Sequence, residues 1–184
     1  PRQGVNEAVC ALSLSQTASY FKREYALPMT TEQIELGINR MVEHFYYEKV
    51  QPKEGMRELL EELRREGVGC VIATATDRHL IEAALRRCSM ERYFDGIFTC
   101  TEVGHGKDEP DIFRACLKAL GTDRDNTVVF EDALHAAATA KCDGFAVVGV
   151  YDKSERHRSE MKALCDCYIT DPVHPDELRR FASD

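Results

Sequence analysis

The chain has 184 residues, of which 43% are hydrophobic and 30% charged, which suits one compact α/β domain or a domain with a small appendage. Its formal net charge of −8 argues against a nucleic-acid partner, because binding to a phosphate backbone depends on clustered Lys and Arg. No apolar run approaches the roughly 18 residues that a membrane span needs, and residues 1–6 do not resemble a signal peptide. We therefore expect no nucleic-acid or membrane partner, whereas a small anionic substrate is compatible with this charge.

Eight cysteines are scattered along the chain, and several lie in apolar patterns, where a free thiol packs as a small hydrophobic group. Cys165 and Cys167 form a C-x-C pair without further ligands at metal-site spacing, which is a weak metal signal. The pattern favours reduced thiols, and we expect a cytoplasmic protein.

Residues 1–50 have a helical pattern. Thr30 and Gln33 are spaced as a capping box, and apolar residues then recur on one face of the predicted helix: Ile34, Ile38, Met41, Val42 and Phe45. Residues 6–24 predict another helix, and no strand is expected within residues 1–48. Residues 50–55 (VQPKEG) are typical of a linker, so we expect a first domain over residues 1–50.

Beyond the linker, strands and helices alternate. Helices are predicted from Met56, around Leu80 and from Pro110. Short apolar runs predict strands at 68–73, 96–100, 127–130, 145–150 and 167–170. This alternation predicts a Rossmann-like, three-layer α/β domain over residues 51–184, with a parallel sheet that binds ligands at the carboxyl ends of its strands.

Three polar motifs follow predicted strands: Thr74 with Thr76, Lys107 in a glycine-flanked loop, and Glu131 with Asp132. Each alone has an ordinary structural explanation as a turn residue, a solvated charge or a partner of a helix dipole. Together they place a hydroxyl, a cation and two carboxylates at one sheet edge. Phosphoryl transfer uses this set, because the hydroxyl and ammonium can hold phosphoryl oxygens while carboxylates hold Mg²⁺. We expect these side chains to line one pocket.

Four stretches carry a resemblance to a known family: 71–76 (VIATAT), 106–113 (GKDEPDIF), 128–133 (VVFEDA) and 140–150 (AKCDGFAVVGV). They resemble the haloacid dehalogenase-like hydrolases, specifically the subfamily with a helical cap that includes phosphoglycolate phosphatase-like enzymes and β-phosphoglucomutase. The resemblance spans roughly residues 50–170 and implies that the helical residues before it form the α-helical cap domain.

The resemblance implies a role for each motif residue. Thr74 would bind the phosphoryl oxygen, Thr76 would make a further phosphate contact, and Lys107 would stabilise the developing charge. Glu131 and Asp132 would serve the Mg²⁺. The chain departs from the family at Ala133, where Ser or Thr is common, and at Ala136, where Gly is common.

A larger departure concerns the nucleophile. The family's attacking aspartate belongs to a D-x-D motif after the first strand, upstream of the cap. The D-x-D of this chain, residues 123–125, follows Gly121 and Thr122 and is expected in a turn. Because the family's first strand lies in the middle of the sheet, its loss would leave two strands unpaired. We therefore expect an upstream segment of the parent protein to supply the strand and nucleophile, and this chain alone to be inactive.

The function implied is a Mg²⁺-dependent phosphatase acting on a small phosphorylated metabolite through a phosphoaspartate, and we expect a monomer. A β-phosphoglucomutase-like sugar phosphate mutase shares the whole apparatus, and Arg40 and Lys49 are candidate cations for its second phosphate. A non-catalytic binding protein of the same fold is a further alternative. Dehalogenation is disfavoured because it has no use for a Mg²⁺ site. A receiver domain would have its acidic pair before its Thr and Lys, the reverse of the order here.

Overall fold

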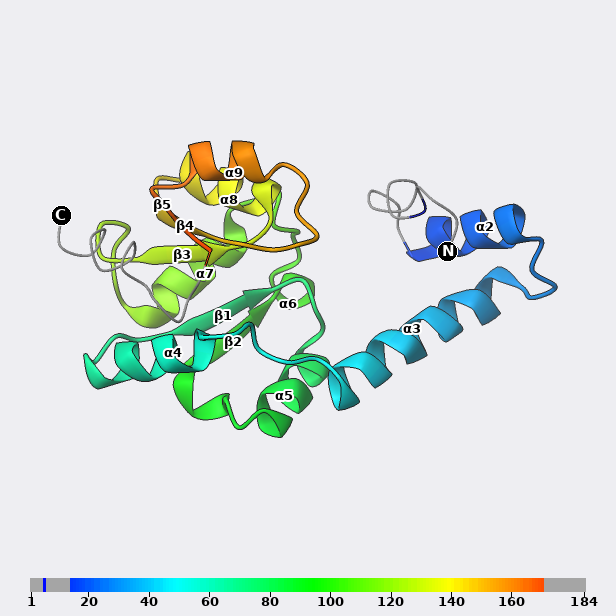
Figure 1. Cartoon of the computed structure of the whole chain (residues 1–184), viewed down its shortest axis with the longest axis horizontal. Coiled ribbons are helices and arrows are strands. Elements are labelled where there is room, and N and C mark those ends of the chain that lie inside the picture. The colour runs from blue at the N-terminus through cyan, green and yellow to red at the C-terminus, as the bar shows by residue number, and fades with distance from the viewer. Residues whose placement is uncertain (1–4, 6–13, 171–184) are drawn as a thin grey trace. The chain divides into compact units, whose positions relative to one another are not determined.

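The computed structural model describes Val5 and residues 14–170. The chain divides into two compact units, residues 1–50 and 51–184, each of which is described separately (Figure 1). Of the helix predicted over residues 6–24, the portion before Leu14 lies outside the described residues.

The described part of the first unit consists of helices α2 (Leu14–Tyr25) and α3 (Thr31–Glu48), which pack against each other and include no strand. The capping box predicted at the start of α3 is confirmed. Thr30 Oγ1 accepts the Gln33 N–H at 3.2 Å, and Gln33 Oε1 accepts the Thr30 N–H at 2.9 Å. These two bonds satisfy donors that the first helical turn would otherwise leave unpaired.

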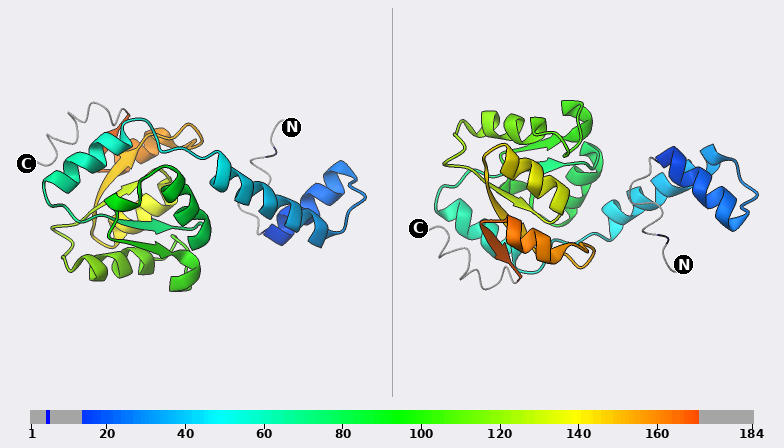
Figure 2. Two further views of the ribbon diagram at one scale, coloured as in Figure 1. Left: turned by 90° about the horizontal axis from the view of Figure 1, so that it is seen from below. Right: turned by 90° about the horizontal axis from the view of Figure 1, so that it is seen from above.

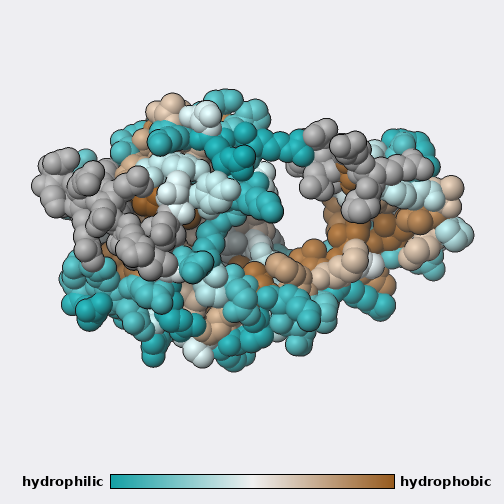
Figure 3. All heavy atoms as spheres, viewed as in Figure 1, coloured by the Kyte–Doolittle hydropathy of each residue, from teal (hydrophilic) through white to brown (hydrophobic). Residues whose placement is uncertain are grey.

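The apolar face predicted on α3 is buried only near its start. Ile34 is buried, whereas Met41 is 65% and Phe45 50% exposed. Hydrophobic surface is accordingly visible over α3 (Figure 3).

The second unit alternates helices and strands, as predicted. In chain order its elements are α4 (Met56–Arg65), β1 (Val71–Thr74), α5 (Arg78–Arg87), the 3-10 helix η1 (Glu91–Tyr93), β2 (Gly96–Thr99), α6 (Cys100–Val103), α7 (Asp111–Leu120), β3 (Val128–Glu131), α8 (Leu134–Cys142), β4 (Ala146–Val150), α9 (Arg158–Leu164) and β5 (Cys167–Ile169). The strands lie between helices (Figure 2). Helices α6 and α9 and the 3-10 helix were not predicted.

All strand pairs are parallel, which confirms the predicted fold class. The predicted single sheet is divided in two: β1 pairs with β2, and β3, β4 and β5 pair in that order. Among the described residues, no ladder joins β1 to β3. In register, Thr74 lies opposite Thr99, and Glu131 lies opposite Gly149.

One hydrophobic core connects both sheets. Its buried residues come mainly from α7, α8 and β4, and include Ile112, Phe113, Ala137 and Val147. Ala73 of β1, Phe98 of β2 and Val129 of β3 pack against this cluster. Burial of each large apolar side chain stabilises the fold by about 1.5–3 kcal/mol, so the shared core holds the two sheets in one unit without a ladder between them.

Two strand boundaries differ from the prediction in a way that matters for the site. Strand β1 begins at Val71 rather than residue 68 and includes Thr74, and β3 includes Glu131. Both side chains therefore belong to the last residue of a strand, with a backbone position fixed by the sheet. No helix of the described residues combines the length and apolar character that crossing a membrane requires.

Candidate active site

The polar residues predicted to be functional lie around the carboxyl ends of β1, β2 and β3. Thr74, the last residue of β1, is opposite Thr99 of β2. Its Oγ1 accepts the backbone N–H of Thr76 at 3.0 Å, which closes the turn after the strand. Because that oxygen accepts a hydrogen bond, the Thr74 hydroxyl is oriented to donate its own hydrogen elsewhere.

The loop after Thr76 is fixed to the neighbouring strand end. Arg78 donates to both carboxylate oxygens of Glu102, at 2.5 and 2.8 Å, and to the Ile97 carbonyl at 2.6 Å. The Arg78 hydrogen bonds, together with the N–H of Thr99, hold the pKa of Glu102 at about 2. Thr101 Oγ1 donates to Asp77 at 3.2 Å. These bonds hold the loops that follow β1 and β2 to each other.

Lys107 and Glu131, which the sequence places 24 residues apart, are in direct contact. Lys107 Nζ donates to Glu131 Oε1, and the two side chains are only 17% and 5% exposed. Removing such charges from water costs several kcal/mol for each ion unless they pair well, so a pair this deeply placed requires its partner. The pair presents a cation at the end of β3.

Cys100, the first residue after β2, is close enough to Lys107 and Glu131 for their charges to affect its thiol. Burial raises the pKa of its thiol; the charge of Lys107 acts against this shift, and the carboxylates of Asp108 and Glu131 add to it. Since the thiolate and not the thiol is the nucleophile, Cys100 is unsuited to attack a phosphate ester at neutral pH.

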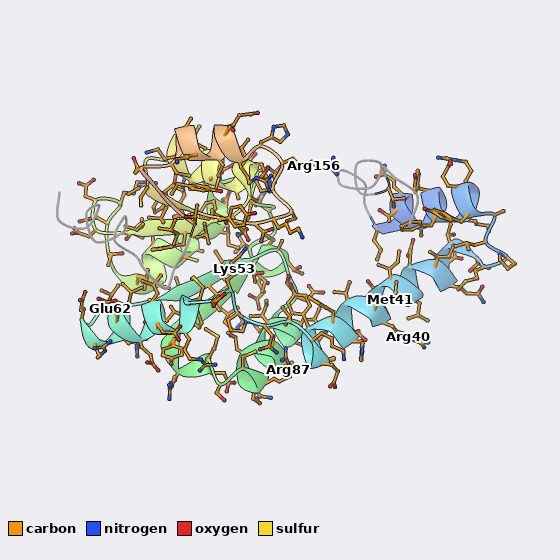
Figure 4. The ribbon with its side chains drawn as sticks, viewed as in Figure 1. Arg40, Met41, Lys53, Glu62, Arg87 and Arg156 are labelled. Carbon is orange, nitrogen blue, oxygen red and sulfur yellow. The ribbon has the colours of Figure 1, made fainter. Side chains whose placement is uncertain are left out.

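Asp132, directly after β3, faces a cation that the sequence analysis missed. Its Oδ2 lies 3.4 Å from Nζ of Lys53, a residue of the linker segment that leads into α4 (Figure 4). Lys53 Nζ also donates to Asp152 Oδ2 and to the Tyr151 carbonyl oxygen, the latter at 3.2 Å. Asp152 follows β4 by two residues, so the rule that found the other motifs, a polar side chain after a strand, could have found it.

Asp152 is held from both sides. Its Oδ1 accepts the Ser154 N–H at 2.7 Å and the Ser154 hydroxyl at 2.5 Å, while Oδ2 accepts from Lys53. The Lys53 hydrogen bond, followed by those of Ser154, lowers the pKa of Asp152 to about 2. Burial alone would lower the pKa of Lys53, but its bond to Asp152 and the charge of Asp132 raise it. Both groups are therefore charged at neutral pH.

The start of α8 shows how the chain accommodates Ala133. This residue occupies the N-cap position and makes no side-chain cap bond. Glu155, from the loop after β4, caps the helix instead, because its Oε2 accepts the Leu134 N–H at 3.0 Å. Its Oε1 accepts the His157 N–H at 2.7 Å. These backbone bonds lower the pKa of Glu155. The loop that carries Asp152 is thus fixed to the helix that follows Asp132.

The described residues contain no cluster of three or more His, Cys, Asp and Glu side chains that could hold a metal ion. They do offer two carboxylates, Asp132 and Asp152, that face one ammonium, with Glu131 at the adjoining position. Mg²⁺ is typically bound in proteins by one or two carboxylates together with water and substrate phosphate oxygens. The oxygen donors fit Mg²⁺ as a partial ligand set, and the Lys53 ammonium shows that they attract a cation.

The structure connects some of the predicted site residues directly and others only by position. Lys107 contacts Glu131, whereas Thr74 shares with them the carboxyl edge of the strands. Asp132 is oriented toward Lys53. Arg40 and Lys49, the candidate cations for a second phosphate, are exposed residues of the first unit.

Comparison with known proteins gives a consistent result. A family model described as haloacid dehalogenase-like hydrolase matches residues 6–142. The chain is 25% identical over 178 residues to the phosphorylated carbohydrates phosphatase of Thermotoga maritima, covering 96% of this chain and 74% of that protein. It is 30% identical over 136 residues to protein CbbY of Cereibacter sphaeroides, covering 66% of this chain and 59% of that protein.

Among solved structures, CbbY from Rhodobacter sphaeroides in complex with phosphate superimposes with a TM-score of 0.76 and 23% identity, covering 97% of this chain and 82% of the other. At this level of identity, the likeness establishes the fold.

Proposed function

Since this chain belongs to the haloacid dehalogenase-like hydrolase family, we propose that it supplies the phosphate- and metal-binding part of a Mg²⁺-dependent phosphatase for a small phosphorylated metabolite. The buried Lys107–Glu131 pair at the strand ends carries this proposal. A cation fixed in a poorly hydrated position stabilises charge that develops on a phosphoryl group far better than one in bulk water. The similarity to a phosphorylated carbohydrates phosphatase supports sugar phosphates as the substrate class.

In this proposal the residues at the strand ends divide the work. The Thr74 hydroxyl, whose oxygen already accepts from Thr76, donates to a phosphoryl oxygen. Lys107 has three N–H donors, of which one goes to Glu131, and directs the others at the transferring phosphoryl group. Glu131 orients Lys107, and with Asp132 it would hold the Mg²⁺. The bound ion would neutralise phosphate charge.

The attacking group in this proposal is an aspartate on a parallel strand between β1 and β3, contributed by a segment that precedes these residues in the parent protein. The support is topological: β1 pairs with β2, β3 pairs with β4, and both sheets pack on one core. An aspartate at the carboxyl end of such a strand would reach the same edge as Thr74 and Glu131.

The chemistry then proceeds in two displacements. The aspartate oxygen attacks phosphorus and the ester bond breaks. The second aspartate of the D-x-D motif, in its acid form, donates its proton to the departing alkoxide. The same group, now a carboxylate, takes a proton from water as the water oxygen attacks phosphorus, and inorganic phosphate leaves with the aspartate restored.

We also propose that residues 1–50 form the substrate-selecting cap of this enzyme, with Arg40 and Lys49 as candidate substrate contacts. The cysteines of the described residues are free thiols, which supports a reducing, cytoplasmic setting. A monomer suffices for this mechanism, because the upstream segment that supplies the attacking aspartate and its acid partner belongs to the same parent protein as the other groups.

The proposal is tested by measuring phosphate release from an aryl phosphate with and without the upstream D-x-D segment. We expect turnover in Mg²⁺ that is lost with EDTA when the segment is present, and none from the 184-residue chain alone. Replacement of the first aspartate of that segment by asparagine is the matched control. If the longer protein releases no phosphate across a broad panel of phosphate esters and sugar phosphates, the family fold serves binding here and the enzyme proposal is wrong.

A further inference from the structure

Lys53 has three oxygen partners that come from two different strand ends. They are the carboxylates of Asp132, after β3, and of Asp152, after β4, together with the backbone carbonyl of Tyr151. Its side chain is 37% exposed, so the ammonium lies at the surface of the second unit rather than within its core. Nothing in the phosphate-binding role of Lys107 or Thr74 explains this arrangement.

The two carboxylates are not equally committed to Lys53. Asp152 is held by two hydrogen bonds from Ser154 on one oxygen and by Lys53 on the other. Asp132 lies farther from the ammonium, at 3.4 Å, and is 45% exposed. Asp132 is therefore the partner that can turn away while Lys53 stays bonded to Asp152.

An ammonium and a divalent cation compete for the same carboxylate oxygens. Lys is a point charge on a flexible four-carbon stem, so it can leave one partner without moving its backbone. Mg²⁺ favours carboxylate oxygen and demands near-octahedral geometry, which an ammonium at the same oxygen would obstruct.

We propose that Lys53 is a positioning residue that holds Asp132 and Asp152 together as an internal cation and releases Asp132 when Mg²⁺ binds. This inference rests on the proposed function, which assigns Asp132 to the metal. In this proposal Asp152 keeps the displaced Lys53 ammonium at the site after Asp132 has turned to the metal.

The position of Lys53 adds a consequence for the linker. Lys53 is the third residue of the second unit, and its carbonyl accepts the N–H of Met56 at 3.2 Å as the chain enters α4. Loss of the Asp132 contact weakens one of the bonds that hold this segment. Mg²⁺ binding should therefore increase amide hydrogen exchange at residues 51–56.

The experiment titrates the chain with Mg²⁺ alone by calorimetry and compares Lys53→Met with Lys153→Met, which removes the same charge from an exposed neighbour of Asp152. Removing the competing ammonium should tighten Mg²⁺ binding at least about threefold beyond the Lys153→Met control, the scale of a partly exposed ion pair. Lys53→Arg, which restores the charge, should bind Mg²⁺ like the unaltered chain.

A merely structural role for Lys53 predicts the opposite sign, since disordered carboxylates bind metal more weakly. Equal or weaker Mg²⁺ binding by Lys53→Met than by Lys153→Met would overturn the inference while leaving the proposed function intact. Absence of Mg²⁺ binding in every variant, including the unaltered chain, would instead contradict the metal assignment of the proposed function, and this inference with it.

Discussion

Acidic residues lie at both edges of the strands in the second unit, and their partners differ between the edges. At the amino-terminal edge, Asp95 accepts the Cys70 N–H at 2.9 Å, and Asp166 accepts the Val147 N–H at 2.8 Å. Each also pairs with a cation, Arg64 for Asp95 and Lys141 for Asp166. These carboxylates join neighbouring strands at their starts through backbone donors.

At the carboxyl-terminal edge, the carboxylates of Glu131, Asp132 and Asp152 depend on lysine ammonium groups. An ammonium can reorient its donors and move on its stem, whereas the backbone N–H of a strand cannot. The difference teaches that backbone N–H donors fix the carboxylates of the amino-terminal edge in addition to their cations, whereas Glu131 and Asp132 at the carboxyl-terminal edge pair with lysine ammonium groups, where a phosphate and a metal ion are proposed to bind.

The largest expected effect concerns Lys107. In the protein that includes the upstream segment, Lys107→Ala should reduce phosphatase turnover on the order of a hundredfold or more, the usual size for loss of one positioned charge stabiliser. The rate is measured with saturating aryl phosphate and Mg²⁺, and circular dichroism and melting temperature should show that the fold is retained. A folded variant with normal turnover would mean that the Lys107 ammonium does not contribute to catalysis at the carboxyl-terminal edge.

The structural edge is tested at Asp143, whose side chain is only 9% exposed and is bound by both Arg114 and Arg124. Asp143→Asn should lower the free energy of unfolding by about 2 kcal/mol, the range for hydrogen bonds to a charged group. Urea denaturation measures this, and Mg²⁺ affinity should be unaltered. A change in Mg²⁺ affinity without a change in stability would contradict the structural role given to the amino-terminal edge.

The same residue gives a pH dependence. The Arg114 hydrogen bonds, followed by that of Arg124, lower the pKa of Asp143 below its ordinary value. Because the folded-state pKa is the lower one, this stabilisation is fully present above about pH 4 and is lost as the pH falls through the folded-state pKa. The stability difference between the unaltered chain and Asp143→Asn should therefore shrink on acidification, as melting temperatures at pH 7 and in acid would show.

A smaller effect is expected for metal binding. Asp132→Asn should weaken Mg²⁺ binding by at least about tenfold, since even residues that only support a metal ligand commonly contribute that much. Asp166→Asn, at the amino-terminal edge, is the matched control and should alter melting temperature alone. Equal Mg²⁺ affinities for the two variants would show that Asp132 is not a metal ligand.

The sequence predicted the parts of this comparison that depend on local pattern. Alternating apolar runs predicted the parallel strands, and the spacing of Thr30 and Gln33 predicted the capping box. The contact of Lys107 with Glu131 follows from the rule that parallel strands end at one edge. The assignment of these residues to phosphate and metal stays a prediction.

Other features depend on tertiary structure. Lys53 and Asp152 are separated by 99 residues, and although the place of Asp152 after β4 was a signal, nothing in the linker pattern indicated that Lys53 would meet this carboxylate. The apolar stripe of α3 likewise shows only which residues share a face, and Met41 and Phe45 of that stripe are exposed. The compensation of Ala133 by Glu155 likewise requires the fold of the loop after β4.

The most direct test of the account is to follow the Lys107 ammonium itself. Lysine-resolved NMR of the chain, titrated with inorganic phosphate in the presence of Mg²⁺, reports whether phosphate reaches this buried cation. We predict a saturable shift of the Lys107 signal that disappears in Thr74→Ala or without Mg²⁺, while Lys141, paired with Asp166 at the amino-terminal edge, stays unchanged. Saturable phosphate binding that leaves Lys107 unshifted would contradict the claim that the carboxyl-terminal edge is the phosphate site.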